Sequence, residues 1–141
     1  MIINTRVIEF SCHSDEYGSL VALESNRDIP FSTKRVYYIY EVDELMRRGF
    51  HSHNDLEQVM ICVHGSVKIL LKTPFEEEVI TLNDPTQGLY VGPMVWREMF
   101  DWQQDAVLLV LASEYYDEND YIRNYEEYEI MARKHFRGSG V

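Results

Sequence analysis

RGFHSHNDLE, residues 48–57, is the stretch around which the rest of this chain is organised. Successive side chains of a β-strand point to opposite faces, so residues i and i+2 share a face. His51 and His53 are therefore expected to project side by side, and Glu57 shares their face if the alternation continues. An imidazole pair either holds a transition metal or transfers protons near neutral pH.

Composition narrows the possible classes of protein. The chain has 141 residues and 45% hydrophobic content, which predicts one folded domain spanning residues 1–141. A net charge of −11 argues against nucleic acid or an anionic membrane as the main partner. Cys12 and Cys62 do not form a CxxC motif. No apolar run approaches the roughly 18 residues of a membrane span, and no basic-then-apolar leader is visible. We expect a cytoplasmic protein.

Short runs of β-branched and aromatic residues recur along the chain, with turn signals between them. The segment 11–16 is polar and is predicted to be a loop, and Gly65 is predicted to lie at a turn. Repeated short strands of this kind predict an all-β sandwich or barrel. The expected strands are residues 3–10, 18–24, 34–42, 57–63, 66–72, 78–82, 88–91, 94–99 and 106–112.

The segment 34–42, KRVYYIYEV, gives the strongest strand signal. Alternation places Arg35, Tyr37 and Ile39 on one face of this strand. The opposite face carries Val36, Tyr38 and Tyr40.

The end of the chain has a different pattern. Acidic residues at 117–120 are typical of a helix entry, where they face the positive end of the helix dipole. Tyr121, Tyr125 and Tyr128 follow at i, i+4 and i+7, which is one face of a helix. We predict a short C-terminal helix over about residues 119–134.

The metal alternative can be weighed from the residues themselves. His-x-His followed by a glutamate resembles the first cupin motif, and metal cupins take a third histidine after a later Gly-Pro turn. Here that region, residues 92–99, reads GPMVWREM, and Arg97 stands where the histidine is expected. A guanidinium has no lone pair to donate and would be repelled by a dication. This favours proton transfer, although the histidines could also have no chemical task.

Five blocks carry a resemblance to a known family, the sugar 3,4-ketoisomerases. The similarity extends from about residue 17 to residue 128. It implies a cupin-like jelly-roll or β-barrel that acts on dTDP-4-keto-6-deoxyglucose. It also implies a homodimer with exchanged β-strands, and an enzyme without metal or redox cofactor. The blocks are KRVYYIY (34–40), RGFHSH (48–53), LEQVMICVHGSV (56–67), GLYVGPMVW (88–96) and SEYYDENDYIRNY (113–125).

The resemblance gives roles to three residues of the expected site. The reaction moves a ketone from C4 to C3 through an enediol, which needs a base near neutral pH and hydrogen-bond donors to the sugar oxygens. By its match to RGFHxH, His51 is the expected C3 base. His53 is expected to relay a proton to or from the sugar oxygens, and Tyr37 to donate to the developing oxyanion.

Four more residues are expected to bind the substrate. Tyr17 and Arg97 resemble the branch of the family that forms dTDP-3-keto-6-deoxyglucose, and both are expected to position the sugar. Arg35 and Arg48 are expected to hold the diphosphate, because guanidinium groups match phosphate geometry.

Two alternatives to this function stay open at this point. One is the galacto-forming branch of the same family, and the other is a non-catalytic cupin-like module that only binds sugars. If the product is dTDP-3-keto-6-deoxyglucose, as the resemblance implies, it is expected to feed the synthesis of an amino sugar, 3-amino-3,6-dideoxyglucose, for surface glycans.

Overall fold

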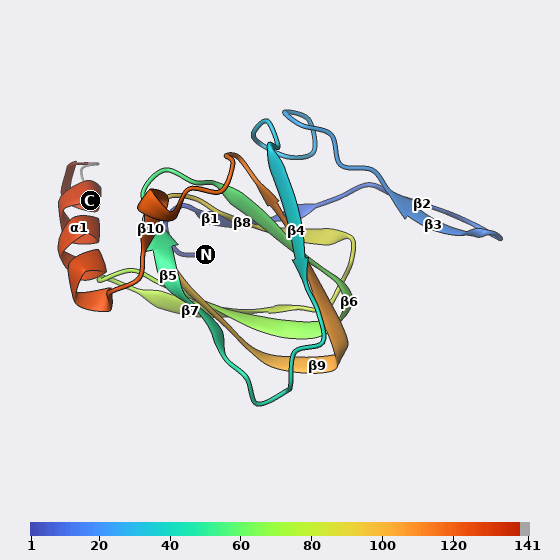
Figure 1. Cartoon of the computed structure of the whole chain (residues 1–141). Helices are drawn as coiled ribbons and strands as arrows, with labels where there is room; N and C mark the ends of the chain where they lie inside the picture. The colour runs from blue at the N-terminus through green and yellow to red at the C-terminus, as the bar shows by residue number, and fades with distance from the viewer. Residues whose placement is uncertain (139–141) are drawn as a thin grey trace.

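A curled antiparallel sheet forms the body of the computed structural model, which describes residues 1–138 (Figure 1). The sheet has the strand order β1-β8-β6-β9-β5-β10, with β4 pairing β9 and β7 pairing β6. This is the predicted all-β barrel-like class with a C-terminal helix. The elements are β1 Thr5–Glu9, β2 Cys12–Asp15, β3 Gly18–Val21, β4 Arg35–Ile39, β5 Arg48–His53, β6 Gln58–Lys72, β7 Glu77–Leu82, β8 Gln87–Val91, β9 Trp96–Ala112, the 3₁₀-helix η1 Glu118–Asp120, β10 Tyr121–Ile122 and α1 Tyr125–Gly138.

Two long strands, β6 and β9, replace the four shorter strands expected over the same residues. They pair with each other, and the register shifts three times between Cys62 and Lys68. The predicted turn at Gly65 was wrong, because the chain bulges there and continues. Gly65 has φ +72°, and a Cβ on it would lie only 2.5 Å from the Gln103 carbonyl oxygen. A bulge of this kind bends and twists the strand without ending it.

The hydrophobic core lies between the curled faces of β6 and β9. Val67, Ile69 and Leu71 alternate inward along β6 and are fully buried. Trp102 and Leu108 of β9 belong to the same core cluster. Because β5 is the next strand beside β9, this packed pair of strands supports the histidine strand.

The alternation predicted for β4 is confirmed. Arg35, Tyr37 and Ile39 are half-buried, and the last two pack against the core. On the opposite face, Tyr38 is 63% exposed, and its neighbours Val36 and Tyr40 are also exposed. An apolar and aromatic strand face therefore lies open on this chain.

The predicted loop at 11–16 was wrong, because Cys12–Asp15 form strand β2, which makes a separate two-stranded sheet with β3. The hairpin turn is stabilised locally: the backbone N–H of Tyr17 donates to Oδ1 of Asp15 at 2.8 Å, and Gly18 takes φ +134°. Ser14 and Ser19 also share a hydrogen bond across the two strands at 2.7 Å. The polar composition reflects exposure, since the hairpin projects away from the sheet (Figure 1).

The C-terminal helix begins at Tyr125, so the predicted start near residue 119 was wrong. The edge of β5 accepts Tyr121 and Ile122 as a short strand before the helix starts. Asn124 then caps the helix, with its Oδ1 accepting from the Glu127 backbone N–H at 3.0 Å. Among residues 1–138, no helix combines the length and the apolar character that crossing a bilayer requires.

Candidate active site

The two histidines of β5 lie side by side inside the curled sheet. The His51 and His53 rings are 4.9 Å apart between centroids and nearly perpendicular. His51 is 9% exposed and His53 is fully buried. Tyr121 of β10 packs against both rings, at 5.0 Å and 4.3 Å. The expectation that Glu57 shares this face was wrong, because β5 ends at His53 and Glu57 instead accepts from the Tyr90 hydroxyl.

Asp120 holds His53 from the far end of the chain. Its Oδ2 lies 3.1 Å from Nδ1 of His53, and the backbone N–H groups of Asp55 and Leu56 also donate to its carboxylate. An ionised carboxylate only accepts hydrogen bonds, so Nδ1 of a neutral His53 carries the proton. Its Nε2 is then the ring's acceptor nitrogen, and this buried atom has no hydrogen-bond partner within residues 1–138.

Arg97 lies directly across from His51 in the ladder between β5 and β9. Its side chain is fully buried, with Nε and Nη2 donating to the Val95 carbonyl at 3.2 Å and 2.9 Å. Nη1 donates to Oε1 of Gln58 at 2.6 Å, and Nε2 of Gln58 donates to the Tyr37 hydroxyl at 2.9 Å. Over the described residues, no acidic side chain lies within ion-pair distance of this guanidinium.

Burial and the charge of Arg97 keep both histidines neutral. Burial, and after it the charge of Arg97, lower the pKa of His51 to about 4. The same two causes hold the pKa of His53 well below its ordinary value. Burial raises the pKa of Tyr37, so its phenol stays protonated. Burial also lowers the pKa of Arg97 to about 10, which leaves it charged at neutral pH.

A neutral, buried His51 makes the fold sensitive to acid. Its pKa is about 4 in the folded chain and about 6.5 when unfolded, so the unfolded state binds more protons between these values. This contribution is fully present above pH 6.5 and is lost as pH falls toward 4, by about 3 kcal/mol at about 1.4 kcal/mol per pKa unit. Urea unfolding from pH 7 to pH 4 should show wild type losing more stability than His51→Asn. Equal losses would contradict the lowered pKa.

A cavity of about 310 Å³ opens beside His51. Its described lining residues include arginines, tyrosines and apolar side chains and none is acidic, although Glu118 next to it pairs with the lining residue Arg123 at 2.8 Å. Its wall is therefore cationic in a chain whose net charge is −11. The lining residues are Arg35, Tyr37, Ile39, Arg48, Gly49, His51, Met99, Tyr116, Tyr121 and Arg123.

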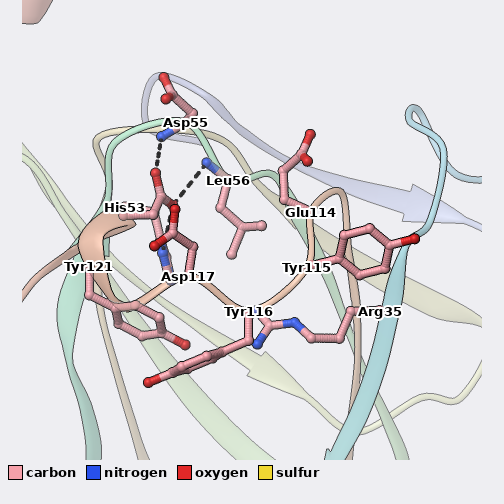
Figure 2. A pocket seen from close by; sticks show the side chains of 10 residues that line it. Arg35, His53, Asp55, Leu56, Glu114, Tyr115, Tyr116, Asp117 and Tyr121 are labelled. Carbon is pink, nitrogen blue, oxygen red and sulfur yellow. Dashed lines mark hydrogen bonds and ion pairs between the residues drawn. The ribbon is translucent and has the colours of Figure 1, made fainter.

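A second cavity, of about 520 Å³, lies on the His53 side and shares Arg35, Tyr116 and Tyr121 with the first. Figure 2 shows Arg35 reaching toward Tyr116, with His53 and Tyr121 on the opposite side of this cavity. The Arg35 guanidinium carbon lies 5.5 Å from the Tyr116 ring centroid. Four acidic residues line the second cavity, so an anionic ligand fits the first one better. They are Asp55, Glu114, Asp117 and Asp120.

The structure brings some of the predicted site residues together and separates others. Arg35, Arg48, Tyr37 and His51 line one cavity, and His53 lies next to it. Arg97 is behind the wall, where its hydrogen bonds go to protein atoms, so it does not touch the cavity directly. Tyr17 is 89% exposed in the turn between β2 and β3. Figure 1 shows this hairpin far from strand β5, which carries the histidines.

Asp120 and Gln58 were missed in the sequence analysis, and Arg123 was not placed among the site residues. Asp120 is separated from His53 by 67 residues, and no local pattern links them. Gln58 begins a strand whose next residues are apolar and buried. A polar side chain at the start of such a strand was the one sequence feature that could have pointed to it. Arg123 stacks on Tyr121 at 4.3 Å and lines the cationic cavity.

The donor set of the site suits proton transfer better than metal binding. Within the described part of the chain, no three His, Cys, Asp or Glu side chains cluster as metal ligands would. The position across the ladder from His51 carries the Arg97 cation, which disfavours a dication there. The remaining groups are two neutral imidazoles, a phenol donor and arginines, which are the parts of an acid–base site for an anionic ligand.

Comparison with known proteins places the chain in a family. A family model described as FdtA, WxcM-like, C-terminal, matches residues 3–133. The chain belongs to the FdtA family. Over 132 residues it is 50% identical to the TDP-4-oxo-6-deoxy-alpha-D-glucose-3,4-oxoisomerase of Aneurinibacillus thermoaerophilus, covering 94% of this chain and 95% of that protein.

Solved structures of ketoisomerases have the same fold as this FdtA-family chain. The 3,4-ketoisomerase QdtA of Thermoanaerobacterium thermosaccharolyticum, in complex with TDP, matches with a TM-score of 0.95 and 59% identity, covering 96% of this chain and 99% of QdtA. QdtA has also been solved as an H51N mutant with TDP-4-keto-6-deoxyglucose and as a Y17R/R97H double mutant with TDP. The WlaRB TDP-quinovose 3,4-ketoisomerase of Campylobacter jejuni matches with a TM-score of 0.87 and 47% identity, covering 90% of this chain and 98% of WlaRB. These matches confirm the predicted cupin-like ketoisomerase fold.

Proposed function

We propose that this chain is a 3,4-ketoisomerase that moves the ketone of dTDP-4-keto-6-deoxyglucose from C4 to C3. The observation that carries the proposal is a neutral imidazole and a protonated phenol, His51 and Tyr37, in one arginine-lined cavity. The names of the relatives support the substrate class, since QdtA was solved with TDP-4-keto-6-deoxyglucose and the Aneurinibacillus relative is named a 3,4-oxoisomerase.

The first step removes the proton from C3, which is acidic because it is α to the C4 carbonyl. Neutral His51 takes this proton, the C–H electron pair forms the C3–C4 double bond, and the carbonyl electrons move to O4. Tyr37 donates a hydrogen bond to that oxygen as its negative charge develops. The fully buried cation of Arg97 lies next to the base and stabilises the same charge at close range.

The second step reverses this process at the neighbouring carbon. O4 takes up a proton, O3 loses its proton as the C3 carbonyl forms, and C4 receives a proton. Two protons leave C3 and O3 and two arrive at C4 and O4, so the substrate and the product have the same composition. His53 is placed to relay the protons of the sugar oxygens, because Asp120 holds its Nδ1–H and leaves Nε2 as an acceptor. No electrons enter or leave the sugar, so the proposed reaction needs no metal or redox cofactor.

The diphosphate of the substrate requires cationic partners, and the cavity supplies them. Arg35 and Arg48 line it, as the sequence suggested. Arg123 lines it too, but its guanidinium is ion-paired with Glu118 at 2.8 Å, so Arg35 and Arg48 are the main candidates. Arg35 is fixed by the rings of Tyr37 and Tyr116, at 5.2 Å and 5.5 Å. A preorganised guanidinium loses less conformational entropy when it binds phosphate.

The decisive test is turnover of dTDP-4-keto-6-deoxyglucose in deuterated water, followed by NMR. Ketone migration from C4 to C3 with deuterium incorporated at C4 is the expected result. Binding of the nucleotide sugar without ketone migration or label would overturn the proposal and favour a non-catalytic sugar-binding module.

We further propose that the product is dTDP-3-keto-6-deoxyglucose. This chain carries Tyr17 and Arg97 at the numbers that describe the QdtA double mutant, and WlaRB is named for quinovose, which is 6-deoxyglucose. The NMR experiment reports the configuration at C4 during turnover. A 3-keto-6-deoxygalactose product would overturn this assignment. A 3-aminotransferase that forms 3-amino-3,6-dideoxyglucose is the proposed next enzyme, in the cytoplasm, where nucleotide sugars are made.

The active unit is proposed to be a homodimer that exchanges strands, with residues 1–141 of each chain acting as one domain. The β2–β3 hairpin projects away from the main sheet of its own chain (Figure 1), and Leu20 in it is 60% exposed. The outer face of β4 exposes Val36, Tyr38 and Tyr40. Apolar faces of this kind are typical of contacts between subunits. Exchange would bring Tyr17 to the site of the partner.

Complementation between two inactive variants tests this arrangement. Tyr17→Ala and His51→Asn chains are each expected to be weakly active alone. Co-refolded at equal amounts, about half of the dimers are mixed, and each mixed dimer has one intact site. Activity should therefore recover to about a quarter of wild type in the mixture. Activity of the mixture equal to the mean of the two variants would contradict a site shared between subunits.

A further inference from the structure

Gln58 connects the buried cation to the phenol of the site. It is fully buried at the start of β6, where its backbone pairs with both β8 and β9. Its carboxamide spans the gap between Arg97 and Tyr37, with contacts of 2.6 Å and 2.9 Å. It lines neither of the two cavities.

The chemistry of the two neighbours fixes how this carboxamide is oriented. A guanidinium only donates hydrogen bonds, so the Gln58 oxygen must face Arg97. The Gln58 NH₂ group must then face Tyr37, and the Tyr37 oxygen accepts from it. The single hydrogen of the phenol cannot point back along that bond. Since Tyr37 lines the cavity beside His51, its hydrogen is directed to whatever fills the cavity.

The hydrogen bonds that link Arg97, Gln58 and Tyr37 make the Tyr37 hydroxyl a better donor. The Gln58 hydrogen bond and the Arg97 charge both lower the Tyr37 pKa, against the larger raising effect of burial. Linked hydrogen bonds of this kind polarise one another.

We propose that Gln58 is a positioning residue that compels Tyr37 to donate its hydroxyl hydrogen to the substrate oxyanion. Gln58 acts through Tyr37 and does not touch the substrate. This inference rests on the proposed isomerase function and adds a residue to its machinery. It predicts that reversing the hydrogen bond between Gln58 and Tyr37 removes the donor while leaving the fold intact.

Gln58→Glu performs this reversal with almost no change of shape. The new carboxylate forms an ion pair with Arg97 and accepts from Tyr37, so the phenol hydrogen turns away from the cavity. The expected result is a fall in kcat of about 10²–10³-fold, the range for losing one oxyanion donor. KM and the thermal midpoint should change little, because the ion pair supports the fold. Gln104→Glu, at an exposed position, is the matched control and should keep wild-type kcat.

A double-mutant cycle with Tyr37→Phe separates positioning from a general structural effect. Once the phenol is absent, Gln58→Glu should cause a much smaller further loss, because only its effect on the charge of Arg97 remains. Multiplying losses, or a Gln58→Glu enzyme with kcat near that of wild type, would overturn the role of Gln58 while leaving the isomerase intact. Wild type without isomerase activity would overturn the proposed function together with this inference.

Discussion

His51→Asn is expected to lower kcat by at least about 10²–10⁴-fold, the usual contribution of a positioned general base. Asparagine keeps a polar side chain of similar size but has no nitrogen that can accept a proton at neutral pH. Removal of the C3 proton should stop, and with it the incorporation of deuterium at C4. Affinity for TDP should stay within a few-fold of wild type, because Arg35 and Arg48 still line the cavity.

Calorimetric titration with TDP and NMR of the sugar during turnover measure these two effects separately. His64→Asn is the matched control, since His64 is exposed on β6 and outside both cavities. If the His51→Asn enzyme still labels C4 at a tenth of the wild-type rate or faster, His51 is not the base and another residue has that role.

Asp120→Asn is expected to give the second large effect. An asparagine amide facing Nδ1 of His53 donates where the carboxylate accepted, so the ring takes the other tautomer, with its proton on Nε2. His53 then presents a donor where the relay needs an acceptor. We expect kcat to fall by about 10²–10⁴-fold, because removing the carboxylate that orients a catalytic histidine has effects of this size.

Asp117→Asn is the matched control for Asp120→Asn. Asp117 lines the same cavity but makes its hydrogen bond to Asn119 at the start of η1, a capping role that asparagine performs equally well. Nitrogen-15 NMR of the two ring nitrogens reports the tautomer of His53 directly. An unchanged tautomer together with unchanged kcat in Asp120→Asn would exclude the proposed role of Asp120.

Local alternation predicted the parts of this fold that depend on neighbouring residues. The half-buried face of β4 and the adjacent rings of His51 and His53 both follow from the two-residue period of a strand. The cationic partner across from His51 could also be anticipated, because Arg97 replaces a residue expected to face the pair.

Features set by long-range contacts could not be read from local patterns. The tyrosine spacing suggested a helix from about residue 119, yet Tyr121 completes a strand because the edge of β5 offers hydrogen-bond partners there. Similarly, Gly65 has the composition of a turn but occupies a bulge beside Gln103. The contact of Asp120 with His53 arises only when this last strand is in place.

The buried guanidinium of Arg97 lowers the thermal stability of the fold while it serves the proposed reaction. A buried charge that has no acidic partner among residues 1–138 destabilises the resting fold, and an apolar side chain of similar length would remove this cost. Directed evolution that scored only survival on heating would therefore select Arg97→Met or Arg97→Leu. The resulting proteins would be more resistant to heat, but they would lack the cation that we propose stabilises the reaction intermediate.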